Sequence, residues 1–136
     1  VFLTQFTGPK RIILFGSEYS THLYRHPLTV SSNIQVGQPD FSRYPKMQEA
    51  KGYECVVEHG DTLFIPSGYW HYLYYLEGGF SLSLRAPANS WLKRLEGLSN
   101  ILSLTLADRL LNKVVGNSRW YQMKEAIAHK RAARLG

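Results

Sequence analysis

Cysteine is nearly absent from this sequence of 136 residues, because Cys55 is its only thiol. One thiol cannot form an internal disulfide, which excludes a disulfide-stapled scaffold and favours a reducing compartment. We therefore expect an intracellular, cytoplasmic protein. Cys55 lies in the alternating run 53–58, where a thiol is more often a small buried apolar group than a catalytic nucleophile.

Long apolar runs are also lacking. No stretch reaches the ~18 apolar residues that a membrane-spanning helix needs, and the start at Val1 lacks the basic-then-apolar profile of a signal peptide. We therefore expect no membrane partner. The hydrophobic content of 44% and the charged content of 19% are typical of a globular domain with one core, which excludes a disordered chain.

Acidic residues are scarce only near the C-terminus. Residues 1–91 carry seven Lys or Arg and seven Asp or Glu, whereas residues 92–136 carry nine and three. The net charge of +6 therefore comes from the tail. Clustered cations can neutralise nucleic-acid phosphates, but a solvated helix face is the more common explanation, so nucleic acid is not the favoured partner.

Short alternating segments predict a mainly β fold. Residues 2–7 and 10–15 are expected to form a hairpin around Gly8-Pro9. Further strands are predicted at 53–58, 61–66, 69–76 and 79–86, with tight turns at His59-Gly60, Ser67-Gly68 and Gly78-Gly79. This spacing suggests a jelly roll. The proline-containing segment 16–52 is predicted to be a long excursion with little regular structure, and such loops tend to be functional.

Two helices are predicted after Pro87. Asn89 or Ser90 can cap the first, and a stripe of apolar residues recurs along it at three- and four-residue intervals, namely Trp91, Leu95, Leu98, Leu102, Leu106 and Leu110. Gly116-Asn117-Ser118 is expected to end it, and residues 120–135 to form a second, basic helix. Their apolar seam can pack either on the β domain or on a second copy of the chain.

The most informative motif is G-D-T-L-F-I-P-S-G-Y-W-H at residues 60–71. It places His71 just after a Pro-x-Gly turn between two predicted strands, and the position of Pro66 fits the restriction of proline to strand ends. The spacing of Gly60, Pro66, Gly68 and His71 resembles the second sequence motif of the cupins and of the JmjC-type 2-oxoglutarate oxygenases.

The resemblance extends over residues 2–15, 38–45, 52–54 and 78–84, and it is closest to the asparaginyl hydroxylase called factor inhibiting HIF and its bacterial cupin-like relatives. It implies a double-stranded β-helix, or jelly roll. Residues 1–87 would be the C-terminal portion of a JmjC/cupin-like barrel. Residues 88–136 would be a helical C-terminal extension, and in the asparaginyl hydroxylase such helices form a dimer interface. We therefore expect a homodimer.

The same resemblance implies Fe(II) and 2-oxoglutarate as cofactors. His71 would be the distal iron ligand, and Lys10 would bind the distal carboxylate of 2-oxoglutarate, with Thr4 and Gln5 as further candidates for the cavity wall. The iron site of this family, two histidines and one carboxylate, also needs a His-x-Asp pair. We expect that pair upstream of Val1, so that the chain as printed would be inactive alone.

Some residues depart from the family pattern or imitate it. Val1 and Arg85 stand where the close relative has asparagines, and Arg85 could instead bind a carboxylate of the cofactor or pair with an acid at the barrel rim. His59-Gly60-Asp61 has the His-x-Asp form but crosses a strand boundary close to His71, so we do not expect it to bind metal. His22 and His26 are expected at the surface, with no third ligand evident.

Two classes of function follow. The first is an Fe(II)/2-oxoglutarate-dependent dioxygenase that hydroxylates a protein side chain or a small molecule, with demethylation left open because it begins with the same C–H oxidation. The second is a catalytically inactive cupin-fold module used for binding or dimerisation. The excursion 16–52 is where we expect substrate recognition in the first case.

Overall fold

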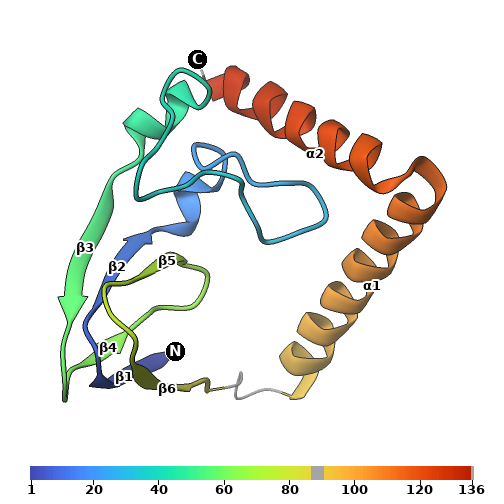
Figure 1. The fold of residues 1–136 in the computed structure, drawn as a ribbon. Helices are drawn as coiled ribbons and strands as arrows, with labels where there is room; N and C mark the ends of the chain where they lie inside the picture. Colours follow the sequence, from blue (N-terminus) through green and yellow to red (C-terminus); the bar gives the residue numbers. More distant parts are fainter. Residues whose placement is uncertain (87–90, 136) are drawn as a thin grey trace.

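The structure is a computed structural model that describes residues 1–86 and 91–135. Within these residues, six strands are followed by two α-helices (Figure 1). The strands are β1 (Phe2–Thr7), β2 (Lys10–Phe15), β3 (Gly52–Val57), β4 (Thr62–Phe64), β5 (Trp70–Tyr75) and β6 (Phe80–Leu84). The helices are α1 (Trp91–Val115) and α2 (Asn117–Ala132), and 3-10 turns cover Ser17–Ser20, Pro45–Glu49 and Ala133–Leu135. All six predicted strands are confirmed, although β4, β5 and β6 are shorter than expected.

The strands form two antiparallel sheets of three, in the orders β4-β1-β6 and β3-β2-β5. The expected hairpin of residues 2–15 is wrong, because β1 and β2 do not pair. Each is the central strand of its own sheet, so both of its edges are already occupied by other strands. The chain passes from one sheet to the other at Gly8-Pro9, as it does between β3 and β4 and between β5 and β6. Together with the C-terminal helices, this arrangement agrees with the jelly roll that the sequence predicts.

Two glycine turns meet at the crossing between the sheets. Gly8 has φ +69°, and a Cβ built on it would lie 2.5 Å from the carbonyl oxygen of Gly78. A Cβ on Gly79 would lie 2.0 Å from the carbonyl oxygen of Thr7. Neither position therefore has space for a side chain. The turn after β1 and the turn before β6 are locked against each other, and the register of these two strands shifts between Gln5 and Thr7.

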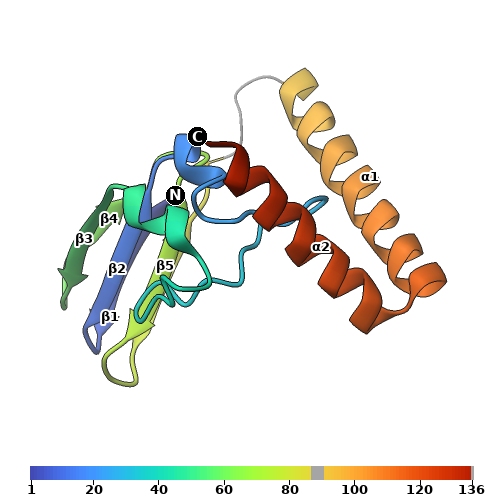
Figure 2. The ribbon, with the colours of Figure 1, turned by 90° about the horizontal axis from the view of Figure 1, so that it is seen from above.

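The central strand β2 contributes to two cores through its alternating faces. Ile12 and Leu14 point between the sheets and pack with Leu3, Val57 and Ile65. Ile13 and Phe15 point the other way, into a core formed with the excursion 16–52 and with α2, whose other members are Leu23, Tyr24, Ile34, Tyr44, Met47, Ala128 and Ala132. Figure 2 shows the resulting order of strands, excursion, α2 and α1. The excursion has only 3-10 turns within it, as predicted.

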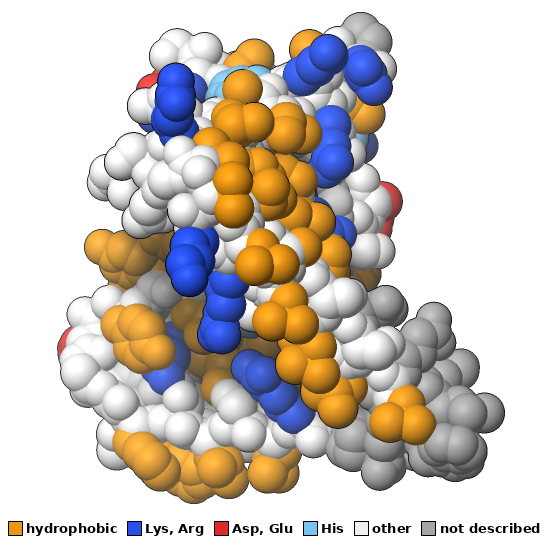
Figure 3. All heavy atoms as spheres, turned by 90° about the vertical axis from the view of Figure 1, so that its right-hand side faces the viewer, with side chains coloured by type: hydrophobic (Ala, Val, Ile, Leu, Met, Phe, Trp, Pro, Cys, Tyr) orange, Lys and Arg blue, Asp and Glu red, His pale blue; other side chains and the backbone are white. Residues whose placement is uncertain are grey.

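The two helices follow each other with one residue between them. Gly116, with φ +90°, separates α1 from α2, so Asn117 and Ser118 lie in α2 rather than in the expected break. The predicted cap residues Asn89 and Ser90 lie outside the described residues. α2 buries Trp120 and Ala128, whereas α1 exposes a band of leucines that Figure 3 shows along the face of the molecule. Among the described residues, no helix combines the length and the apolar character needed to cross a membrane.

Candidate functional site

Two of the residues with a predicted cofactor role, Lys10 and His71, lie on the strand faces that are turned toward the interior between the two sheets. In the antiparallel pairing of β2 with β5, Leu14 is opposite His71 and Lys10 is opposite Tyr75. Residues that are opposite each other share a face, and residues four apart on one strand also share it. Lys10 and His71 therefore face the same interior as Ile12 and Leu14. Four residues along a strand correspond to roughly 13 Å, a separation that a lysine side chain and a five-carbon dicarboxylate can bridge together.

Lys10 is a buried ammonium group without a carboxylate partner among the described residues. Its side chain is only 3% exposed. The Nζ atom donates a hydrogen bond to Ser81 Oγ on the opposite sheet and lies 4.5 Å from the centre of the Tyr75 ring. Within the described part of the chain, no Asp or Glu forms an ion pair with it. Burial of an unpaired charge is costly, so an anionic cofactor group at this position fits the residues that surround it.

Gln5 and Ser81 extend this polar cluster. Gln5 is fully buried and faces the interior opposite Ser81. Its Nε2 donates hydrogen bonds to the carbonyl oxygens of Thr7 and Gly8, whereas its Oε1 is buried without a partner in the described residues. An orphaned buried oxygen is rare in folded proteins and marks a place where a ligand or water can donate a hydrogen bond. Sequence reasoning did not find Ser81, whose signal is the Ser81-Ser83 alternation in β6.

Thr4 lies on the other face of β1. Since Gln5 points into the interior, its neighbour Thr4 points outward, where its Oγ1 atom is 2.9 Å from Thr62 Oγ1. The structure therefore does not bring Thr4 together with Lys10 and His71. The cofactor-binding role of Thr4 stays a prediction without support from this arrangement, and Gln5 is the better placed of the two.

His71 lies at the rim of the interior, near the start of β5, and its side chain is exposed. Its Nδ1 is 3.3 Å from the carbonyl oxygen of Tyr69. Nε2 makes no hydrogen bond within the described residues, so this nitrogen is available to a metal ion. Two hollows adjoin the ring, one of about 200 Å³ beside Phe15 and Tyr72 and one of about 530 Å³ beside Tyr69.

The aromatic residues around His71 divide between the two faces of β5, as alternation predicts. Trp70 and Tyr72 pack against the core that β2 forms with the excursion and α2, and Tyr69 packs against the inner core, which is the one between the two sheets. The indole Nε1 of Trp70 also donates to Ser20 Oγ at 2.9 Å. These contacts fix the start of β5 and therefore the position of His71.

A complete metal site is not formed by the described residues. No group of three or more His, Cys, Asp or Glu among them could hold a metal ion. His71 is one imidazole of suitable chemistry, and its role as an iron ligand stays a prediction. The His59-Gly60-Asp61 sequence does not join it. His59 Nδ1 contacts the carbonyl oxygen of Phe6, and Asp61 Oδ2 accepts a hydrogen bond from the Glu58 amide at 2.8 Å.

Two further sequence candidates lie away from the interior cluster. Arg85 follows β6, is exposed and forms no ion pair with a described residue, so its predicted cofactor role also stays a prediction. Cys55 packs against the inner core. Burial raises the pKa of its thiol, with smaller contributions from Asp61 and Glu54, which agrees with a small apolar group rather than a nucleophile.

Glu125 of α2 holds the excursion in place. Its Oε2 lies 2.8 Å from His26 Nε2 and accepts a hydrogen bond from Asn33 Nδ2 at 2.8 Å. Its Oε1 accepts from Tyr44 Oη at 2.6 Å and from Arg43 Nη2 at 3.2 Å. The expected surface position of His26 is therefore wrong, since this ring is only 3% exposed. Sequence reasoning missed Glu125 altogether, because its four partners in the excursion lie more than 80 residues away.

The protonation states in this network follow from its contacts. Burial alone would raise the pKa of Glu125, but hydrogen bonds from Tyr44 and His26 outweigh it and lower the pKa below its ordinary value. Burial and the hydrogen bond to Glu125 raise the pKa of Tyr44 to about 12. Tyr44 is therefore a stable donor and Glu125 a stable acceptor at neutral pH. His22 is not part of the network, and its Nε2 lies 3.8 Å from Glu49.

The comparisons with known proteins agree with this geometry. The sequence matches the family described as Cupin-like domain over residues 2–125. It is 40% identical over 83 residues to tRNA wybutosine-synthesizing protein 5 of Gallus gallus, a match that covers 61% of this chain and 26% of that protein. It is 40% identical over 85 residues to lysine-specific demethylase 8 of Danio rerio, covering 60% and 21%.

A third match is lysine-specific demethylase JMJ30 of Arabidopsis thaliana, 33% identical over 84 residues, which covers 60% of this chain and 20% of that protein. The chain thus spans about a quarter or less of the length of these relatives. The family match includes β1, β2, the excursion and the His71 motif, and it continues into α2. By its sequence, its two facing sheets and its enzyme relatives, the chain belongs to the cupin-like domain family, which is of the JmjC type.

Proposed function

We propose that this chain forms part of an Fe(II)- and 2-oxoglutarate-dependent oxygenase. Lys10 binds the distal carboxylate of 2-oxoglutarate, and His71 is one of the iron ligands. The observation that carries the proposal is the buried Lys10 ammonium, which has no carboxylate partner among the described residues and faces the same interior as His71. A bound dicarboxylate supplies the counter-charge that this lysine needs.

The residues around Lys10 have distinct tasks in this proposal. Ser81 holds the ammonium from the opposite sheet, and Gln5 Oε1 accepts a hydrogen bond from a cofactor-associated water. The apolar side chains Ile12 and Leu14 exclude bulk water from the space between Lys10 and His71, which strengthens the charge pairing. When bound, iron and 2-oxoglutarate supply with O2 the oxidising power for substrate C–H hydroxylation, and the 2-oxoglutarate is converted into succinate and CO2.

The substrate in this proposal is a protein side chain or a small molecule, recognised by the excursion 16–52. The larger hollow beside His71 is lined by Ser17, Ser20, Arg25 and Val30 of the excursion. Two of the relatives are named as demethylases and one as a tRNA-modifying protein. Demethylation begins with the same C–H oxidation as hydroxylation, so both outcomes use the same arrangement of Lys10 and His71.

The test is the binding of 2-oxoglutarate to the full-length protein, measured by titration calorimetry with Mn(II) as a non-oxidising substitute for iron. We expect Lys10→Met to weaken binding by roughly 30-fold or more, since it removes a charge-assisted contact. Lys10→Arg should retain part of the affinity. Lys51→Met is the matched control, because Lys51 is an exposed lysine just before β3. His71→Ala should abolish the contribution that Mn(II) makes to the binding of 2-oxoglutarate.

Equal affinity for 2-oxoglutarate in the wild-type protein and in Lys10→Met would rule out the role of Lys10. If the wild-type protein binds neither 2-oxoglutarate nor metal and forms no succinate, the oxygenase proposal fails. That result would favour an inactive cupin-fold module used for binding or dimerisation. Thermal unfolding of each variant separates loss of the cofactor site from loss of the fold.

We also propose that the C-terminal helices pair with those of a second copy in a homodimer. On α1, seven large apolar side chains are between 53% and 83% exposed, namely Leu95, Leu98, Ile101, Leu102, Leu106, Leu110 and Val114. They form a band along the helix at three- and four-residue spacing (Figure 3). When two such helices pack against each other, the band of one can contact the same band of the other along its length. Contiguous apolar patches of this kind mark interaction surfaces.

A further inference from the structure

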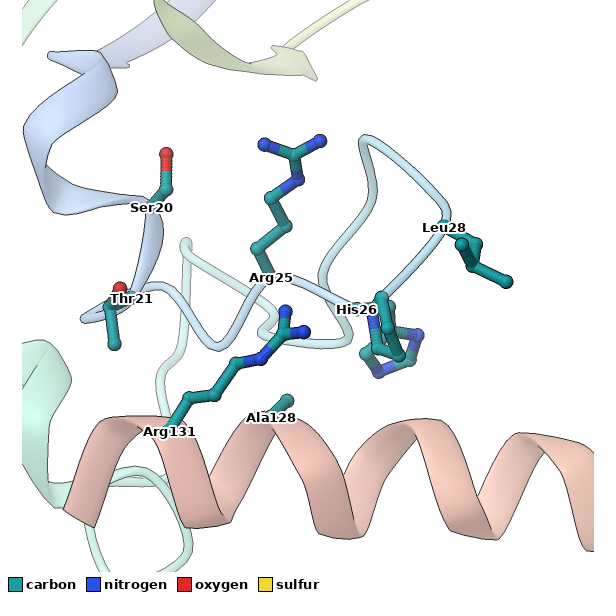
Figure 4. A pocket seen from close by; sticks show the side chains of 8 residues that line it. Ser20, Thr21, Arg25, His26, Leu28, Ala128 and Arg131 are labelled. Atoms are coloured by element: carbon teal, nitrogen blue, oxygen red, sulfur yellow. The ribbon is translucent and has the colours of Figure 1, made fainter. Parts of the chain in front are cut away.

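Two neighbouring hollows meet at Arg25. One, of about 270 Å³, lies between residues 20–28 of the excursion and α2, and both Arg25 and Arg131 line it. In Figure 4, Arg131 extends from α2 toward the excursion, and Arg25 points onward, away from the helix. The second hollow, of about 530 Å³, is lined by Arg25 and also by His71. A group bound between the two arginines therefore lies beside the space that reaches His71.

The two arginines carry charge that no described acid neutralises. No described Asp or Glu lines either hollow, and neither guanidinium forms an ion pair within residues 1–86 and 91–135. Two other arginines do form ion pairs, since Arg11 contacts Glu54 and Arg43 contacts Glu125. Arg25 Nε donates to the carbonyl oxygen of Thr29 at 2.9 Å, which fixes the side chain, and its terminal nitrogens make no hydrogen bond to a described residue.

The backbone that presents Arg25 is strained. Tyr24 has φ +52° and Leu28 has φ +61°, and both are bulky residues in the left-handed region. This conformation is unfavourable for residues that carry a Cβ and tends to occur at functional sites. Buried contacts hold it, because the Tyr24 ring packs on Tyr44 and His26 contacts Glu125. The fold thus tolerates an unfavourable backbone conformation in the turn that exposes Arg25.

We propose that Arg25 and Arg131 bind the phosphate monoester group of a small-molecule substrate whose reacting carbon lies in the hollow beside His71. Two guanidinium groups match a group that carries about −1.5 to −2 charges at pH 7 and offers three acceptor oxygens. The hydroxyl of Thr21, which lines the same hollow, adds a donor. A nucleic-acid phosphodiester has one charge and matches this doubly cationic hollow less well. That the ligand is the substrate rests on the proposed function, whereas the phosphate site does not.

The experiment measures the binding of inorganic phosphate and of adenosine monophosphate to the full-length protein by titration calorimetry, without metal or 2-oxoglutarate. We expect Arg25→Gln and Arg131→Gln each to weaken phosphate binding by about 10-fold, and the double variant by about 100-fold. Arg119→Gln on α2 is the matched control and should bind like the wild-type protein. Both target arginines are exposed, so thermal unfolding of the variants should be unchanged.

Three results would overturn the proposal. These are no binding of either phosphate compound to the wild-type protein, an equal loss of affinity in Arg119→Gln, and binding of a single-stranded oligoribonucleotide without binding of either phosphate compound, which would indicate a nucleic-acid contact. The titration of 2-oxoglutarate is performed on the same protein. Phosphate binding without 2-oxoglutarate binding would support the phosphate site and contradict the proposed oxygenase function. Binding of 2-oxoglutarate without phosphate binding would contradict only the phosphate site.

Discussion

The two C-terminal helices differ in how they are held. α2 has the more polar sequence, and yet it buries Trp120, Lys124, Glu125, Ala128 and Ala132 against the excursion and α1. α1 has the clearer apolar stripe, and yet its described leucines are mostly exposed. Small residues and the hydrogen-bonded carboxylate of Glu125 let α2 pack closely on the sheet domain. The large apolar side chains of α1 remain exposed and can contact another surface. An apolar stripe therefore identifies a contact surface without identifying the partner.

The largest effect should come from the α2 side of this comparison. Glu125→Gln removes the charge that His26, Asn33, Arg43 and Tyr44 share. We expect the free energy of unfolding to fall by about 3–5 kcal/mol, as when one member of a buried ionic network is removed. Urea denaturation followed by tryptophan fluorescence measures it.

The matched control for Glu125→Gln is Glu54→Gln, which affects only the exposed pair with Arg11. Exposed pairs contribute little to stability, so this control should unfold like the wild-type protein. A Glu125→Gln variant as stable as the control would show that the network is not what holds α2.

The leucines of α1 give the next effect, on association rather than on folding. The substitutions Leu102→Asp and Leu106→Asp together should convert a dimer into a monomer, as measured by sedimentation equilibrium. Burying each leucine contributes about 1.5–3 kcal/mol, so the dissociation constant should rise by roughly 100-fold or more. Because both side chains are exposed in one copy of the chain, the unfolding midpoint measured on the monomer should not fall. A wild-type protein that sediments as a monomer would contradict the homodimer.

How far the sequence predicted this molecule depends on the range of each interaction. Local patterns located all six described strands and the position of His71, because alternation and Pro-x-Gly turns are local. The family resemblance added Lys10. The face of Thr4 was not predictable from alternation, since Phe2, Leu3 and Phe6 are apolar on both faces of β1. The passage of the chain from one sheet to the other between β1 and β2 was missed, because a tight turn has the same sequence pattern whether or not the strands beside it pair.

The burial of His26 shows the same limit. A histidine followed by proline in a polar loop is usually exposed, and here its environment comes from Glu125, which lies 99 residues later. The partner is equally hidden, because a single glutamate in a basic helix looks like part of a solvated face. Long-range polar contacts leave no periodic signal in the sequence. The polar network of Glu125 that supports the candidate site was therefore not predictable, although the strands of the site were.

The smallest effect concerns Asp108, which joins the two helices. Its Oδ1 accepts hydrogen bonds from Trp120 Nε1 at 2.8 Å and from Lys124 Nζ at 3.1 Å. Asp108→Asn weakens these bonds but keeps the shape, so we expect a loss of about 1–2 kcal/mol. Burial alone would raise the pKa of Asp108, but the bonds from Trp120 and Lys124 lower it overall.

A carboxyl group with a lowered pKa in the folded state stabilises the protein above its unfolded value, near 3.9 for Asp, and this contribution disappears as the pH falls through the folded pKa. The difference in unfolding free energy between the wild-type protein and Asp108→Asn should therefore be constant from pH 5 to 7 and shrink below about pH 4. Urea denaturation at a series of pH values measures it. A difference that stays constant down to pH 2 would mean that the ionised Asp108 carboxylate does not stabilise the junction between α1 and α2, and that α1 is held there by packing alone.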